Sequence, residues 1–165
     1  MSTELHWLEG LWPGKLALAA RPRGGEWLED EVSGWKRAGV NAVLSLLTPE
    51  EEADLQLTEE GKEIRRQELD FSSFPIQDRQ VPHSEEKLGE VLNKLNHQLS
   101  AGRNVLVHCR QGVGRSGLIA ACLLIKNGMS PGAAVDAASA ARGVEIPETS
   151  EQREWIEHYA PAFSK

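Results

Sequence analysis

A cysteine and an arginine six positions apart are the residues of this sequence best suited to act on an anion. Cys109 follows the apolar run 104–108, and Arg115 comes after a turn that contains Gly112 and Gly114. Such a turn directs backbone N–H groups and the positive end of the next helix at one centre, which stabilises a thiolate. Arg115 would return to that centre, where its guanidinium can hold two phosphate oxygens. The spacing predicts a nucleophilic thiolate within an anion-binding loop.

The rest of the loop makes this interpretation more specific. Its two glycines supply the backbone freedom that a tight anion-binding turn needs, and Ser116 places a hydroxyl near the sulfur. A Cys-x5-Arg pair alone often arises by chance, as a buried cysteine followed by an exposed arginine. The string His-Cys-x-x-Gly-x-Gly-Arg-Ser-Gly over residues 108–117 is far more specific. Sulfurtransferases and arsenate reductases also use a cysteine in such a loop, so the loop alone leaves several reactions open.

Residues 107–117 resemble the signature loop of the protein tyrosine phosphatase superfamily throughout. The resemblance implies that Cys109 is the nucleophile and Arg115 the phosphate clamp. It also implies that His108 orders the loop by hydrogen bonds and that Ser116 helps the thiolate to leave the intermediate. The residues expected to bind phosphate are Arg110, Gln111, Gly112, Val113, Gly114 and Arg115. For Arg110, a solvated loop residue is an equal alternative.

Expulsion of an alkoxide or phenoxide from phosphorus requires a proton donor near the leaving oxygen. Asp78 lies in a proline-bounded loop, residues 74–82, and precedes Cys109 by 31 positions. This segment resembles the general-acid loop of the superfamily in composition and spacing. The alternative is an exposed loop carboxylate or a helix cap, and Asp54 and Asp70 lack the proline-bounded loop. We therefore predict Asp78 as the general acid.

A phosphocysteine must then be hydrolysed, with Asp78 acting as a base toward water. Residues 145–152 resemble the segment that in several members supplies a glutamine for this water, so Gln152 is the candidate. An ordinary polar residue in the last helix is the alternative. Cys122 lies in an apolar stretch and is interpreted as core. A sulfurtransferase would not need Asp78, and an arsenate reductase would need a thiol relay that a buried Cys122 does not readily provide.

Alternating short strands and helices must position these residues. Hydrophobic periodicity and capping residues predict strands at 15–19, 41–47 and 104–108, an apparent strand before residue 74, and helices at 26–38, from Thr48 onward, 84–99, 117–126, 130–141 and 150–159. This pattern predicts an α/β fold: a mainly parallel sheet of about four to five strands with helices on both faces, like that of protein tyrosine phosphatases. Residues 1–165 are expected to form a single phosphatase domain.

The resemblance also bears on the substrate. The chain shows no counterpart of the N-terminal recognition segment that deepens the pocket of larger tyrosine-specific enzymes. A shallower, dual-specificity pocket follows, which would accept phosphotyrosine and also phosphoserine or phosphothreonine in proteins. Arg110 and Arg79 could add positive charge at its mouth, although lipid-directed relatives often carry two basic residues in the loop, where this chain has Val113. Phosphoinositides or RNA 5'-phosphates are alternative substrates, and a non-catalytic phospho-binding module is the alternative from another class.

Composition restricts the remaining possibilities. A formal net charge of -7 argues against a general nucleic-acid binder and leaves a phosphorylated protein or peptide as the expected partner. The only two cysteines and the lack of a leader or long apolar segment predict a soluble, cytoplasmic protein without membrane insertion. A monomer is favoured. No metal or organic cofactor is expected, because Arg115 and the loop amides supply the electrostatic stabilisation.

Overall fold

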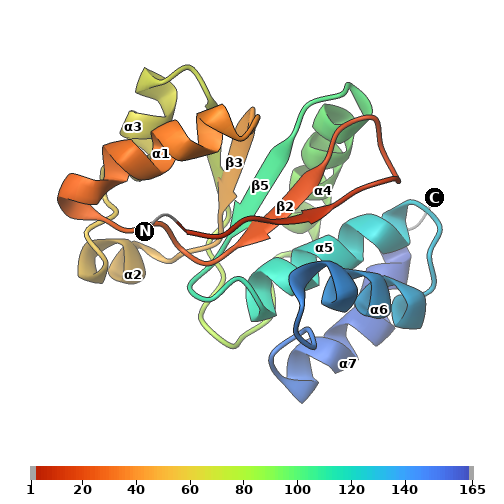
Figure 1. Cartoon of the computed structure of the whole chain (residues 1–165). Helices are drawn as coiled ribbons and strands as arrows, with labels where there is room; N and C mark the ends of the chain where they lie inside the picture. The colour runs from red at the N-terminus through yellow and green to blue at the C-terminus, as the bar shows by residue number, and fades with distance from the viewer. Residues whose placement is uncertain (1–2, 164–165) are drawn as a thin grey trace.

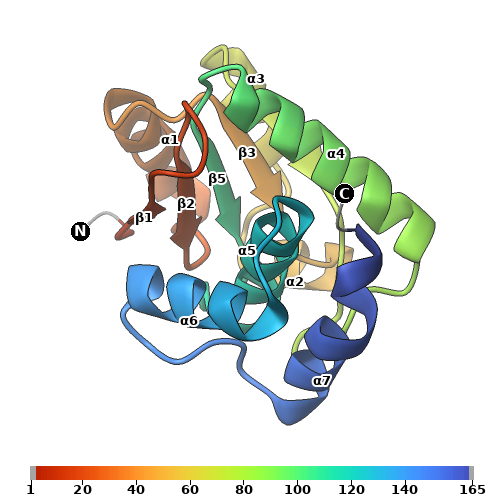
Figure 2. The ribbon, with the colours of Figure 1, turned by 90° about the vertical axis from the view of Figure 1, so that its right-hand side faces the viewer.

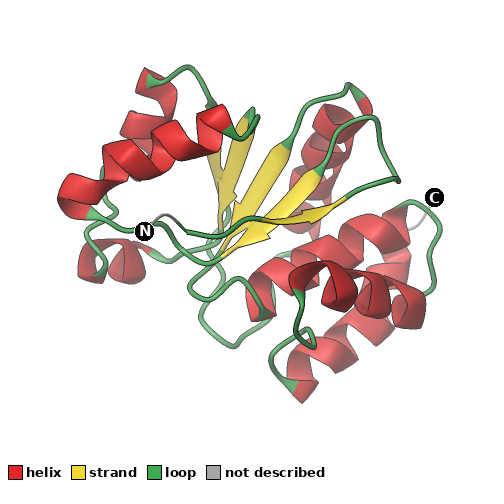
Figure 3. Ribbon diagram, viewed as in Figure 1, coloured by secondary structure: helices red, strands yellow, loops and turns green. Residues whose placement is uncertain are grey.

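The computed structural model describes residues 3–163 and shows a five-stranded sheet between layers of helices (Figure 1, Figure 3). In the sheet the order is β1-β2-β5-β3-β4, with β1 antiparallel to β2 and every other neighbouring pair parallel. The strands are β1 (His6–Leu8), β2 (Leu16–Ala19), β3 (Ala42–Ser45), β4 (Asp70–Ser73) and β5 (Val105–His108). The predicted α/β fold with a mainly parallel sheet is confirmed.

The helices cover both faces of this sheet. Helices α1 and α3 lie together on one face, whereas α4 and α5 cover the other and α6 and α7 pack outside α5 (Figure 1, Figure 2). Within residues 3–163, no helix has the length and apolar character to cross a membrane. The bounds are α1 (Leu28–Arg37), α2 (Pro49–Asp54), α3 (Glu60–Arg66), α4 (Glu85–Ser100), α5 (Gly114–Lys126), α6 (Pro131–Arg142) and α7 (Ser150–Tyr159), with 3-10 turns at Gly25–Trp27 and Ala160–Phe163.

The central strands are buried on both faces, which explains why they are apolar almost without interruption. Successive side chains of a strand point to opposite faces. Leu106 of β5 therefore belongs to the hydrophobic cluster under α1 and α3, while Val105 and Val107 belong to the cluster under α4 and α5. The sheet thus separates two apolar cores, and polar side chains of the central strands are confined to the strand ends.

Most helix boundaries follow the capping residues that the sequence predicts. Thr48 caps α2 in a capping box with Glu51, Ser130 caps α6, and Gly143 ends α6 in the left-handed conformation at φ +85°. Helix α5 begins at Gly114, three positions before the predicted start at residue 117, because the anion-binding loop passes directly into the helix. Our prediction of that boundary was wrong.

Two elements were not predicted. The strand β1 has only three residues, and α3 is a polar helix whose N-cap residue makes no side-chain hydrogen bond. Only Glu60 and Ile64 of α3 are buried. One apolar residue in two turns gives no periodic signal, so tertiary packing determines this helix.

The carboxyl ends of the four parallel strands meet at one edge of the sheet. The residue at the end of β5, His108, pairs in register with Ala19 at the end of β2 and with Ser45 at the end of β3. Ser45 in turn pairs with Ser73 at the end of β4. Segments that follow these strands are therefore brought together, and such an edge is where open α/β sheets bind ligands.

Candidate active site

The loop after β5 folds around the sulfur of Cys109. The side chain of Cys109 is 2% exposed, and its Sγ accepts a hydrogen bond from the backbone N–H of Gly112 at 3.2 Å. Gly112 has φ +75°, and a Cβ at this position would overlap the carbonyl group of Ala19. Only glycine satisfies both conditions without strain. The loop therefore holds its backbone amides against the sulfur.

Helix α6 supports this loop from outside. Arg142 donates from Nε to the carbonyl oxygen of Gly112 at 3.0 Å and from Nη2 to that of Gln111 at 3.1 Å. The carbonyl of Arg110 accepts the N–H of Arg21 at 3.2 Å. Because these carbonyls are bonded on the outer side, the peptide N–H groups that follow them are directed inward, as in an anion-binding nest.

Arg115 is held by a buried carboxylate from α2. Its side chain is 1% exposed, and it donates from Nη1 and Nη2 to the two oxygens of Glu51 at 2.7 and 2.9 Å. Nη1 also donates to the carbonyl of Ile76 at 2.7 Å. Burial lowers the pKa of Arg115, but its hydrogen bonds to Glu51 and the charge of Cys109 outweigh burial and raise it. The guanidinium is thus fixed as a cation beside the loop.

Glu51 itself is strongly affected by this contact. Burial alone would raise the pKa of its carboxyl, but hydrogen bonds from Arg115 and from the backbone N–H of Thr48 lower it from 4.5 to about 2. A carboxyl whose pKa is lower in the folded than in the unfolded chain stabilises the fold above the unfolded value. This contribution is fully present above about pH 4.5 and is lost as the pH falls through about 2.

We therefore predict that Glu51→Gln lowers the free energy of unfolding at pH 7 by about 3 kcal/mol, because Arg115 stays buried without its counter-ion. The difference from the parent should shrink as the pH falls from 4.5 toward 2. Urea unfolding of both proteins across this pH range measures it. Glu50→Gln removes an exposed neighbouring charge and is the matched control. A pH-independent difference would contradict the prediction.

Asp78 lies directly beside Arg115. Its Oδ1 is 3.2 Å from Nη2 of Arg115, and its side chain is 48% exposed, so it faces both the loop and solvent. Asp70, by contrast, is at the amino end of β4 and pairs with Arg103 at 2.6 Å, and Asp54 is exposed at the end of α2. Of the three aspartates considered, Asp78 is the one that the fold brings to the loop.

The loop that contains Asp78, residues 74–82, is attached at two points to the segment 148–152 at the start of α7. Arg79, at φ +64°, pairs with Glu148 at 3.2 Å, and Gln152 donates from Nε2 to the carbonyl of Gln80 at 3.0 Å. Oε1 of Gln152 also accepts the N–H of Thr149 in a capping box. Gln152 thus lies against the loop, fully buried, with both ends of its amide in hydrogen bonds.

The remaining residues named from the sequence also gather at this edge. Ser116 is buried, and its Oγ has no hydrogen-bond partner among residues 3–163. Arg110 is 42% exposed, and its Nη1 lies 3.5 Å from Oε2 of Glu51. The carboxylate of Glu51 thus contacts both Arg110 and Arg115. Val113 is the N-cap residue of α5 and Gly114 is its first residue. His108 is buried and bonded to Glu60 of α3.

Three residues at the site were not predicted from the sequence to belong to it. Glu51 had a local signal, since it follows the Thr48 cap by three positions, but that signal predicted only a helix start. Glu60 and Arg142 had no local signal, because each reaches the loop from a helix distant in sequence. In residues 3–163, no cluster of three or more His, Cys, Asp or Glu side chains could hold a metal ion.

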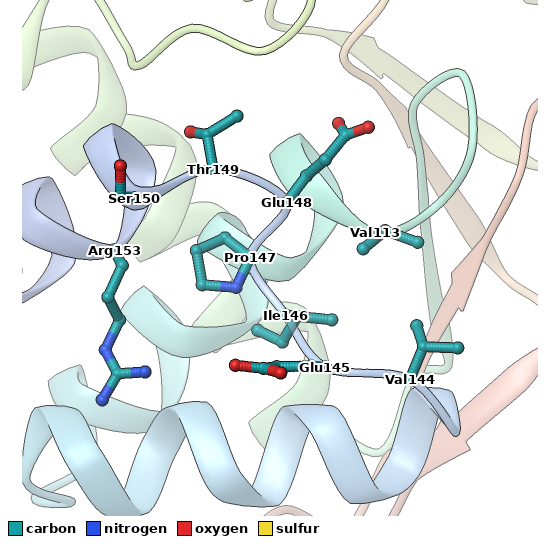
Figure 4. Close-up of a pocket in the computed structure, with 9 residues that line it drawn as sticks. All are labelled: Val113, Val144, Glu145, Ile146, Pro147, Glu148, Thr149, Ser150 and Arg153. Carbon is teal, nitrogen blue, oxygen red and sulfur yellow. The ribbon is translucent and has the colours of Figure 1, made fainter.

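A pocket of about 670 Å³ adjoins the loop at Val113. Neither Cys109 nor Arg115 lines this pocket, so it flanks the reactive centre. Glu148 lies beside Val113, and Glu145 and Arg153 lie on the other side of the pocket (Figure 4). Its other lining residues are Val144, Ile146, Pro147, Thr149 and Ser150. Two carboxylates therefore form part of the surface next to the loop that follows β5.

Comparison with known proteins gives a family match over nearly the whole chain. A family model described as "Swiss Army Knife protein, DSP-PTPase phosphatase domain" matches residues 5–160. Cyclin-dependent kinase inhibitor 3 of Rattus norvegicus is 35% identical over 72 residues, which cover 42% of this chain and 34% of that protein. The match thus spans about a third of that relative's length.

Two solved structures share the fold. Kinase associated phosphatase, in a form whose catalytic site cysteine is replaced by serine, superposes with a TM-score of 0.90 at 22% identity, over 99% of this chain and 97% of the other. PTPMT1 in complex with PI(5)P gives a TM-score of 0.73 at 21% identity, over 94% and 95% of the two chains. At these identities the likeness establishes the arrangement of strands and helices.

Proposed function

Because this chain belongs to the Swiss Army Knife family of DSP-PTPase phosphatase domains, we propose that it hydrolyses phosphotyrosine, and also phosphoserine or phosphothreonine, in proteins through a phosphocysteine at Cys109. One observation carries the proposal: Arg115 and Asp78 lie 3.2 Å apart beside a loop whose Gly112 amide bonds to the Cys109 sulfur. Nucleophile, phosphate clamp and proton donor are then within one site.

In the first step Sγ of Cys109 attacks phosphorus, the S–P bond forms and the bond to the leaving oxygen breaks. Arg115 and the loop amides bind the non-bridging oxygens, whose charge they stabilise in the transition state. The Nη2 atom that contacts Asp78 in the free protein turns to a phosphate oxygen, and Asp78 is released toward the leaving oxygen. Asp78 then gives that oxygen its proton.

In the second step water attacks the phosphocysteine, and Asp78 takes a proton from this water. The S–P bond breaks, inorganic phosphate leaves and the thiolate of Cys109 is restored. Ser116 has a buried hydroxyl with no partner within the described chain, which is therefore available to donate to the departing sulfur. Gln152 lies against the loop, and to position the water it would exchange its bond to the Gln80 carbonyl.

The charges around the site favour a phosphoprotein as substrate. Arg79 pairs with Glu148, so its charge is compensated, whereas Arg110 lies 3.5 Å from Glu51, whose carboxylate also binds Arg115. Glu145 lines the flanking pocket, and its carboxylate would repel a further phosphate of an inositol ring or a nucleic-acid chain. A peptide that carries a single phosphate avoids this repulsion.

The test is phosphate release from a panel of phosphotyrosyl, phosphoseryl and phosphothreonyl peptides, a phosphoinositide in micelles and a 5'-phosphorylated RNA. We expect kcat/KM for the phosphotyrosyl peptide to exceed that for the lipid and the RNA by about tenfold or more. PTPMT1, which shares the fold, was solved in complex with PI(5)P. A higher kcat/KM for the phosphoinositide than for the phosphotyrosyl peptide would overturn the substrate assignment. Binding without any release would indicate a phospho-binding module.

We further infer a reducing, cytoplasmic setting and a single phosphatase domain that acts as a monomer. Cys109 and Cys122 are both free thiols in the structure, and the proposed reaction consumes neither oxidant nor metal. A disulfide at Cys109 would remove the nucleophile. A reducing compartment keeps it available.

A further inference from the structure

A buried carboxylate contacts the histidine that precedes Cys109. Glu60, the first residue of α3, places Oε2 at 2.5 Å from Nε2 of His108, and both side chains are 0% exposed. His108 ends β5 and immediately precedes Cys109, so this pair adjoins the loop from inside the protein. The general reaction described above makes no use of Glu60.

The pair is polar in an otherwise apolar place. The ring of Trp35 lies beside the ring of His108 in a tilted orientation, with 6.1 Å between the ring centroids. Trp35 belongs to the apolar core under α1 and α3. Within residues 3–163, Oε1 of Glu60 and Nδ1 of His108 have no hydrogen-bond partner. A buried charge requires compensation, and an apolar pair of similar volume would often be at least as stable. Packing alone therefore gives little reason for a carboxylate here.

The surroundings supply few other charges that could control His108. From α2, Glu52 interacts with both members of the pair: burial and the charge of Glu60 raise its pKa, and the charge of His108 opposes them. From β2 and β3, the residues paired with His108 are Ala19 and Ser45, which do not ionise, and α1 contributes the Trp35 ring. Cys109 follows in the chain. The buried Glu60 is thus the direct partner of His108.

We propose that Glu60 is a positioning residue that acts through His108. Its carboxylate accepts the Nε2 proton, fixes the ring on the α1 and α3 side of β5 and stabilises the positively charged imidazolium. The positive charge of the pair then lies one residue from Cys109, where it favours the thiolate over the thiol. This role rests on the proposed function, because Glu60 would promote ionisation of the same Cys109 thiol that attacks phosphorus.

The test is Glu60→Gln, which keeps the size and hydrogen-bonding capacity of the side chain but removes its charge. We expect the pH midpoint for alkylation of Cys109 by iodoacetamide to rise by about one unit, with an accompanying loss of about tenfold in kcat/KM at pH 6. Glu59→Gln removes an exposed charge from the preceding position and should leave the midpoint in place. A midpoint that is unchanged or lower in Glu60→Gln would overturn the proposal.

A double-mutant cycle shows whether Glu60 acts through the ring. His108→Gln should raise the same midpoint, and adding Glu60→Gln to it should cause no further rise, because the effects of coupled residues are not additive. Additive shifts would contradict the proposal. If Glu60→Gln does not fold by circular dichroism, Glu60→Asp carries the test: it keeps the charge and must retain the parent midpoint to within about 0.3 units.

Alkylation is measured without substrate. Its result therefore stands even if no phosphorylated compound in the panel is hydrolysed, and failure of the proposed function is distinguishable from failure of this inference.

Discussion

Cys109→Ser is expected to lower phosphate release from a phosphotyrosyl peptide by on the order of 10⁵-fold or more, because a serine hydroxyl in the loop has no base to activate it. The loop amides and Arg115 do not depend on the sulfur for their position, since Glu51, Ile76 and Arg142 hold them. Binding of the peptide should therefore persist. Steady-state release and a binding isotherm on the same protein measure both parts.

The intermediate gives a more direct readout. Rapid acid quench of the parent protein with a ³²P-labelled peptide should trap label on the chain, and Cys109→Ser should trap none. Cys122→Ser is the matched control. Burial raises the pKa of the Cys122 thiol, which lies within α5 in the apolar core, so we expect its replacement to leave labelling intact. Labelled Cys109→Ser protein would identify another nucleophile and refute the mechanism.

Local patterns carried most of the fold prediction. Apolar strands buried on both faces, the caps Thr48, Ser84 and Ser130, and the left-handed Gly143 each depend on residues within a few positions. Such interactions are visible in sequence because their partners are near. Helix α3 shows the opposite case: its buried residues are a glutamate and one isoleucine, and only the tertiary structure explains why it is there.

The site divides in the same way. Cys109 and Arg115 belong to one loop, so their spacing alone predicted a shared centre. Glu51 and Glu60 come from α2 and α3, and their ion pairs cross 64 and 48 positions of sequence. No periodicity or capping rule links residues so far apart. The carboxylates that hold the clamp and the histidine were therefore accessible only from the structure.

The local charge near the loop after β5 depends on ion pairs as well as on the number of basic residues. From the sequence, Arg79 and Arg110 could add positive charge at the mouth, with a solvated loop residue as an equal alternative for Arg110. Each has a carboxylate partner, Glu148 at 3.2 Å and Glu51 at 3.5 Å, which the sequence did not reveal. A count of basic residues near a loop overstates the local field when acids from other elements lie among them.

Asp78→Ala is expected to lower kcat for a phosphotyrosyl peptide by a factor of about 100 to 10,000, because the leaving oxygen departs without a proton. The loss should be larger for phosphoserine, whose alkoxide is a poorer leaving group, and smaller for p-nitrophenyl phosphate, whose phenoxide is stable. Substrate binding should persist, since Arg115 keeps its bonds to Glu51 and Ile76. Measurements of kcat and KM on the three substrates test this ordering.

The ordering separates acid catalysis from a structural role of the Asp78–Arg115 contact. If Asp78 only held the guanidinium at 3.2 Å, its removal would slow all three substrates by the same factor. Asp54→Ala, an exposed aspartate on α2, controls for the loss of one negative charge and should leave all three rates near those of the parent. Near-normal turnover of phosphoserine by Asp78→Ala would exclude Asp78 as the proton donor. A loss graded by leaving group, with binding retained, requires a proton transfer at the leaving oxygen, and Asp78 is the aspartate that the fold brings to Arg115.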